Sequence, residues 1–103
     1  MLIPTHRRPT SPGEILLEQF LKPLGISQTA LAERLGIPIQ RVNLIVNGKR
    51  GITSETAWLL AGALSTTPEF WMNMQTGYDL AVSKPKKLPA PFPGAKAAAR
   101  QTA

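Results

Sequence analysis

A three-residue link, Leu35-Gly36-Ile37, constrains the fold more than any other feature of the sequence. On either side of it, the apolar residues of segment 28–47 follow helical spacing, in which positions three and four apart share one face. The apolar stripes consist of Leu31, Ala32 and Leu35 before the link, and of Val42, Ile45 and Val46 after it. A link this short, centred on a glycine, predicts two short helices that meet at a sharp angle, with Gly36 at positive φ.

The second of these helices has an amide-rich outer face. Opposite its apolar stripe it carries Gln40, Asn43, Leu44 and Asn47, spaced i, i+3, i+4 and i+7. Amides can bond bidentately to adenine edges, whereas a merely solvated helix usually carries Glu and Lys. A plain helical hairpin would explain the two apolar stripes alone. The glycine link and the amide face together favour a helix-turn-helix that reads DNA.

Start signals elsewhere in the chain predict an all-α fold of five helices with no strand. The first is an S-x-x-E capping box at 11–14, with proline at the first helical position. Pro23 is expected to end the first helix, Pro38 to lie in the first turn of the third, and the last helix to fade near Ala81. Further N-caps are expected at Ser27, at Thr53 or Ser54, and at Thr67.

The chain divides into three segments by composition. Residues 1–10 are expected to form a flexible arm and residues 11–82 the helix-turn-helix domain. The tail 83–103 is rich in Pro, Ala and Lys, and Leu88 and Phe92 are its only large apolar residues. It is expected to be disordered, because it cannot bury enough surface to order itself.

The net charge of +6 belongs mostly to this tail. From Lys84 onward there are five basic residues and no acidic one, whereas the first 83 residues carry seven basic and six acidic groups. Overall basicity is therefore weak support for DNA binding by the domain. The stretch from Arg41 to Arg50 counts for more, because it holds three cations and no acid, as a phosphate-gripping element should.

Several other functional classes are disfavoured. The chain has no cysteine and its one histidine, His6, lies in the arm, so no histidine-based triad or zinc cluster can be built. We therefore expect no enzyme activity, no catalytic residue, no cofactor and no metal site. The N-terminus has no apolar run typical of a signal peptide and nothing resembles a membrane span, so a soluble cytoplasmic protein is expected.

The sequence resembles two nested families of DNA-binding proteins. Gln28, Ala32, Gly36, Val42 and Ile45 stand at the key spacings of the phage-repressor-like (XRE/Cro) helix-turn-helix family. A wider match over residues 9–80 is similar to the HigA-type antitoxins of bacterial toxin–antitoxin operons. It is carried by the stretches PTSPGEIL, LGISQTALAERLGI, RVNLIVNGKRGIT and TTPEFWMNMQ.

The resemblance implies a role for each residue of the reading unit. Gln28 and Thr29, at the start of the second helix, would meet the phosphate backbone. Asn47, Lys49 and Arg50 would hold the phosphates of the far strand. The expected base-contacting residues are Gln40, Arg41, Asn43 and Leu44. Arg41 flanks this face, so its expected contact is either a guanine or a phosphate group. Leu44 departs from the polar type expected at its position, and a contact with a thymine methyl group is slightly favoured over an incidental surface residue.

The resemblance also implies partners. Family members act as homodimers on palindromic operator DNA and neutralise a RelE-like, mRNA-cleaving toxin (HigB), while repressing their own operon. The alternative is a stand-alone transcriptional repressor with no toxin partner.

Phe70 and at least one of Trp58 and Trp71 are expected in the core. The remaining apolar face of the fifth helix is the expected dimer contact.

Overall fold

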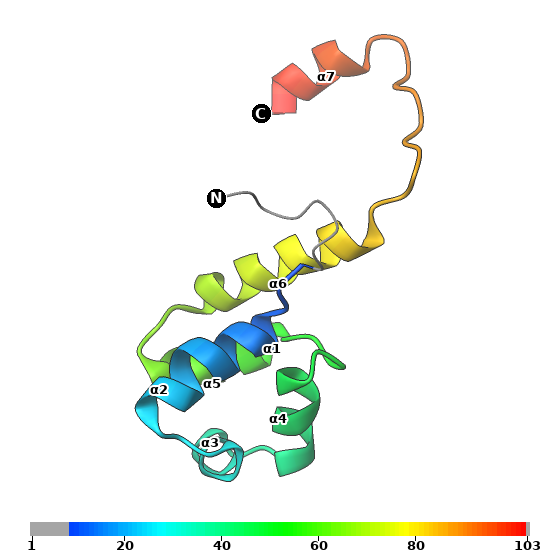
Figure 1. Ribbon diagram of the computed structural model, residues 1–103. Coiled ribbons are helices and arrows are strands. Elements are labelled where there is room, and N and C mark those ends of the chain that lie inside the picture. The colour runs from blue at the N-terminus through cyan, green and yellow to red at the C-terminus, as the bar shows by residue number, and fades with distance from the viewer. Residues whose placement is uncertain (1–8, 103) are drawn as a thin grey trace.

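The computed structural model describes residues 9–102, which form helices and no strand. One continuous helical run comprises α1, η1 and α2, and it is followed by α3 and α4, then by α5, α6 and α7 (Figure 1). The bounds are α1 Pro12–Ile15, η1 Leu16–Leu21, α2 Lys22–Leu24, α3 Gln28–Leu35, α4 Ile39–Val46, α5 Ser54–Leu64, α6 Pro68–Ser83 and α7 Ala95–Thr102. The all-α prediction is confirmed, with five helical rods up to Ser83, whereas α7 was not expected.

The helix starts follow the capping signals of the sequence. At four helices the side-chain oxygen of the N-cap accepts a hydrogen bond from the backbone amide three residues later, which satisfies a group with no partner inside the helix. Thr53, and not Ser54, caps α5. The donor–acceptor pairs are Glu14 to Ser11 at 3.3 Å, Ala30 to Ser27 at 3.0 Å, Thr56 to Thr53 at 3.3 Å and Phe70 to Thr67 at 3.1 Å.

The first helical run widens before it ends. Over η1 its backbone takes the wider π-helical form, and the amide of Lys22 donates to the carbonyl of Leu17, five residues earlier. In a regular α-helix the ring of Pro23 would clash with the carbonyl group four residues before it, and wide turns are a recognised accommodation of such strain. The run ends at Leu24, one residue beyond Pro23, and its C-cap Gly25 adopts φ 65°.

The core is formed by buried residues of η1, α3, α4, α5 and α6. Trp71 of α6 is fully buried, and its indole nitrogen donates to the hydroxyl of Thr66 at 2.7 Å. Phe70 was expected in the core but is 37% exposed; it packs at the edge, with ring centroids 5.0 Å from Trp71. Trp58 is 69% exposed on α5, so Trp71 alone of the two tryptophans fills the core.

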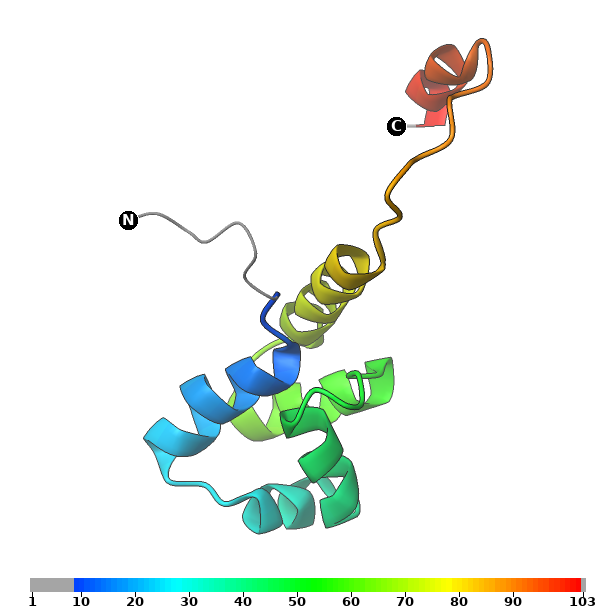
Figure 2. The ribbon, with the colours of Figure 1, turned by 45° about the vertical axis from the view of Figure 1, so that its right-hand side comes forward.

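The tail leaves the helical body at the end of α6. In both views the segment after Ser83 runs outward, and α7 lies away from the other helices (Figures 1 and 2). Residues 84–100 are exposed except for the half-buried Ala95. Within the described part of the chain, no helix combines the length and apolar character needed to cross a bilayer. The arm residues 1–8, which include His6, lie outside the described residues.

Candidate nucleic-acid interface

The link between α3 and α4 has the geometry expected from its glycine. Gly36 adopts φ 71°, and the amide of Ile37 donates to the carbonyl of Ala32 at 3.1 Å, which closes the end of α3. Pro38 differs from the prediction by one position: it has extended backbone, ψ 144°, and immediately precedes α4. Its carbonyl accepts the amide of Arg41 at 3.0 Å, so it still starts the helix.

The two faces of α4 are sharply divided. Val42, Ile45 and Val46 are buried against the core. The opposite face holds the exposed residues Gln40, Asn43, Leu44 and Asn47. Leu44 is 40% exposed, so it is a surface side chain among amides rather than a member of the core.

The position of α4 is set by a backbone contact with α1. A Cβ atom added at Gly13 would overlap the carbonyl oxygen of Ile45, and would lie 2.6 Å from its carbonyl carbon and 3.1 Å from the Cα atom of Val46. Any side chain at this position would therefore push the two helices apart. The sequence showed Gly13 only as part of the PGEIL stretch, because such a contact joins residues more than thirty positions apart.

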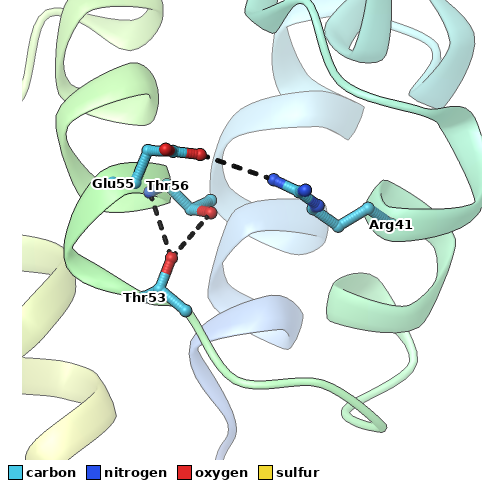
Figure 3. A network of polar contacts seen from close by, with 4 residues as sticks. All are labelled: Arg41, Thr53, Glu55 and Thr56. Atoms are coloured by element: carbon cyan, nitrogen blue, oxygen red, sulfur yellow. Dashed lines mark hydrogen bonds and ion pairs between the residues drawn. The ribbon is translucent and has the colours of Figure 1, made fainter.

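Arg41 lies at the border between α4 and α5 and is held by an acidic partner. Its guanidinium nitrogen is 3.7 Å from a carboxylate oxygen of Glu55 in the first turn of α5 (Figure 3). The Arg41 side chain is 29% exposed and that of Glu55 is 77% exposed. Thr53 caps α5 directly beside this pair, through the amide and the hydroxyl of Thr56. Nothing in the sequence indicates that Glu55 meets Arg41, because the two residues are fourteen positions apart.

The basic loop after α4 is built onto the helix by its backbone. The amides of Lys49 and Arg50 both donate to the carbonyl of Leu44, at 2.9 and 3.2 Å. Gly48 adopts φ 73°, which allows the chain to turn back in this way. The side chains of Asn47, Lys49 and Arg50 are exposed. The loop therefore presents its two cations from a defined backbone.

Gln75 anchors the far end of this loop. It is buried on α6, and its side-chain oxygen accepts the amide of Ile52 at 2.7 Å, while its amide nitrogen donates to Asp79 at 2.9 Å. An open cleft of about 440 Å³ lies between the loop and α6, and it is lined by Lys49 and Arg50 on one side and by Tyr78 and Asp79 on the other. Sequence reasoning missed Gln75, since a single glutamine on a helix carries no signal of this contact.

The remaining predicted residues stand at the start of α3. Gln28 is half-buried and Thr29 is exposed, in the first two positions after the N-cap Ser27. The first amides of a helix have no intrahelical partner and carry the positive end of the helix dipole, so this end suits a phosphate group. The nine predicted contact residues thus come from three consecutive elements: the start of α3, the outer face of α4 and the loop after it.

Comparisons with known proteins match this architecture. The helix-turn-helix family matches residues 17–71, more than half of the chain. Antitoxin HigA-1 of Vibrio cholerae is 47% identical over 76 residues, covering 74% of this chain and 71% of that protein. The antitoxin HigA of Pseudomonas aeruginosa, solved with the higBA promoter, is 43% identical with a TM-score of 0.72, covering 74% of this chain and 83% of that one.

A further solved structure, the antitoxin GraA in complex with its operator, is 37% identical with a TM-score of 0.67, covering 86% of this chain and all of that one. The chain belongs to the helix-turn-helix family, and within it to the HigA-type antitoxins. The resemblance noted in the sequence is therefore confirmed. The roles of the individual contact residues stay predictions.

Proposed function

We propose that this protein is a sequence-specific DNA-binding antitoxin that represses its own operon as a homodimer on a palindromic operator. The observation that carries the proposal is the exposed amide face of α4, next to a loop whose two cations are presented from a backbone tied to that helix. Two similar proteins were solved with promoter or operator DNA, which supports the same kind of ligand here. The proposed location is the cytoplasm, where bacterial operator DNA lies.

The exposed face of α4 suits the major groove. Gln40 and Asn43 are proposed to bond base edges, and Leu44 to contact a thymine methyl group. Arg41, which is held at the border of this face by Glu55, is proposed to contact either a guanine or a phosphate group. Gln28, Thr29, Asn47, Lys49 and Arg50 are proposed to grip phosphates on either side of the groove.

Two substitutions separate base reading from phosphate binding. Asn43→Ala is expected to reduce discrimination between operator variants, because base-edge bonds are worth about 1–3 kcal/mol each. Arg50→Ala is expected to weaken binding to all DNA about equally, because a phosphate contact carries no sequence information. Titration of labelled operator and of point-mutated operators measures both effects. Equal effects of the two substitutions would contradict this division of roles.

One helix-turn-helix makes few contacts, so the proposal requires two copies on two half-sites about one DNA turn apart. Arg41, Lys49 and Arg50, used twice, would neutralise about six phosphates and contribute a slope near −5 to a plot of log K against log salt. A measured slope shallower than about −2 would rule out this mode of binding.

The proposed dimer contact is the apolar face of α6, where Leu80 and Val82 are exposed. The exposed Trp58 on α5 is a second apolar site.

Toxin neutralisation is the second half of the proposed function. Similar proteins are named as antitoxins, and the proposed partner is a small mRNA-cleaving toxin of the HigB/RelE class. The discriminating observation is the neighbouring reading frame. Its product should be toxic alone, harmless when this protein is co-expressed, and should co-purify with it. A harmless neighbour that does not co-purify would favour the alternative, a stand-alone repressor.

A further inference from the structure

The tail is the most strongly charged part of the molecule, and no contact between its cations and an acidic residue of the described chain is seen. Lys84, Lys86, Lys87, Lys96 and Arg100 stand in a segment without a single acidic residue. The first 83 residues are close to neutral, with seven basic and six acidic groups. Two of those acids already face cations, Glu18 beside Lys22 and Glu55 beside Arg41. The partner that fits the tail is therefore a separate polyanion.

The tail starts beside the phosphate-gripping loop. Tyr78 and Asp79, near the end of α6, line the same cleft as Lys49 and Arg50. Lys84 follows Asp79 by five residues, which corresponds to roughly 7 Å along a helix. The hydroxyl of Ser83 donates to the carbonyl of Asp79 at 2.6 Å, at the last turn of α6. The first cation of the tail, Lys84, therefore follows closely in sequence on the part of α6 that faces the loop.

The composition of the tail gives it reach. Four prolines occur among the nine residues 85–93, which favours a stiff, extended chain of about 3.1 Å per residue. That length spans roughly 28 Å, or about eight base pairs of duplex DNA. Beyond it, Lys96 and Arg100 are four residues apart, so they share one face of α7. An eight-residue helix is too short to be stable alone, so α7 also needs a partner surface.

From these observations we infer that the basic tail is a second DNA-binding element, which grips the phosphates of duplex DNA flanking the operator without reading its sequence. This inference rests on the proposed operator binding. The tail begins four residues after Asp79, which shares a cleft with Lys49 and Arg50, and its five cations are exposed. Each lysine or arginine that meets a phosphate steepens the salt dependence by about 0.9.

The test compares three full-length proteins on operator DNA with long flanks and on operator DNA trimmed to the two half-sites. The first is the wild type. The second replaces the five tail cations by glutamine (K84Q, K86Q, K87Q, K96Q and R100Q). The third is a charge-retaining control (K84R, K86R, K87R and K96R). Because the tail is exposed, all three should show the same thermal unfolding of the folded part.

With long flanks, the wild type and the arginine control should have salt slopes steeper by about 2 or more than the glutamine variant, whose slope stays near −5. Trimming the flanks should lower wild-type affinity about tenfold or more and leave the glutamine variant unchanged. Slopes that differ by less than about 2, or equal sensitivity to trimming, would overturn the inference. If none of the three proteins binds the operator at all, the proposed function itself fails.

Discussion

Gly13 offers the sharpest test of how the reading helix is held. In Gly13→Ala the new Cβ atom would meet the backbone of α4 at Ile45 and Val46 rather than the end of a flexible side chain. The added atom lies 2.6 Å from the carbonyl carbon of Ile45, whereas an ordinary contact needs about 3.4 Å. The helices must therefore separate by about 1 Å, because a backbone carbonyl inside a helix cannot rotate away.

The expected loss of stability follows from this geometry. Overpacking costs about 1–3 kcal/mol, and the rigid backbone partner places Gly13→Ala at the upper end of that range. Alanine is a better helix former than glycine, and this difference offsets up to about 1 kcal/mol of the loss. The net loss is about 2 kcal/mol, equivalent to a fall in Tm of about 8–16 °C for a domain of this size. Operator affinity should fall as well, because the displaced helix carries the predicted base contacts.

Thermal unfolding followed by circular dichroism at 222 nm measures the change. Gly62→Ala is the matched control, since it makes the same substitution within α5, where an added Cβ meets nothing within 4 Å. It should raise stability by about 0.5–1 kcal/mol through helix propensity alone. A Gly13→Ala protein that melts within about 4 °C of the wild type would refute the close contact between α1 and α4.

Two further substitutions probe contacts that sequence reasoning did not find. Gln75→Ala should lower the free energy of unfolding by about 1–3 kcal/mol, because the buried amide of Ile52 loses its acceptor. Chemical denaturation measures this loss, and a loss no larger than that of the exposed Thr76→Ala would contradict the prediction. Glu55→Gln should change the free energy of unfolding little, since the carboxylate is mostly exposed. Because the substitution releases Arg41, it should raise affinity for all DNA and reduce discrimination between operator variants. An equal gain in DNA affinity from Glu69→Gln, in the first turn of α6, would mean that the effect comes from net charge alone and not from Arg41.

The part of the fold that could be predicted from sequence is the part encoded by local signals. The caps at Ser11, Ser27, Thr53 and Thr67 act within three residues, and the turn at Gly36 depends on one backbone conformation. These local rules set where helices begin and which faces are apolar. They yielded the five helices up to Ser83 and the inner and outer faces of α4.

Contacts between distant residues could not be predicted in the same way. The approach of Gly13 to α4, the ion pair of Arg41 with Glu55 and the anchor from Gln75 to the loop join residues 14 to more than 30 positions apart. The choice of Trp71 over Phe70 as the buried aromatic depends on how α6 rotates against the core. Helix α7 was missed because its alanine-rich sequence has no large apolar side chain to suggest packing.

The carbonyl of Leu44 has a consequence for how such proteins can diverge. It accepts the amides of Lys49 and Arg50, so the loop is attached to α4 through main-chain atoms, independently of the side chain at this position. If the outer face of α4 reads the operator as proposed, substitutions there would change the preferred operator while leaving the loop in place. Selection for a new target site could proceed one side chain at a time, with nonspecific affinity for DNA retained at each step.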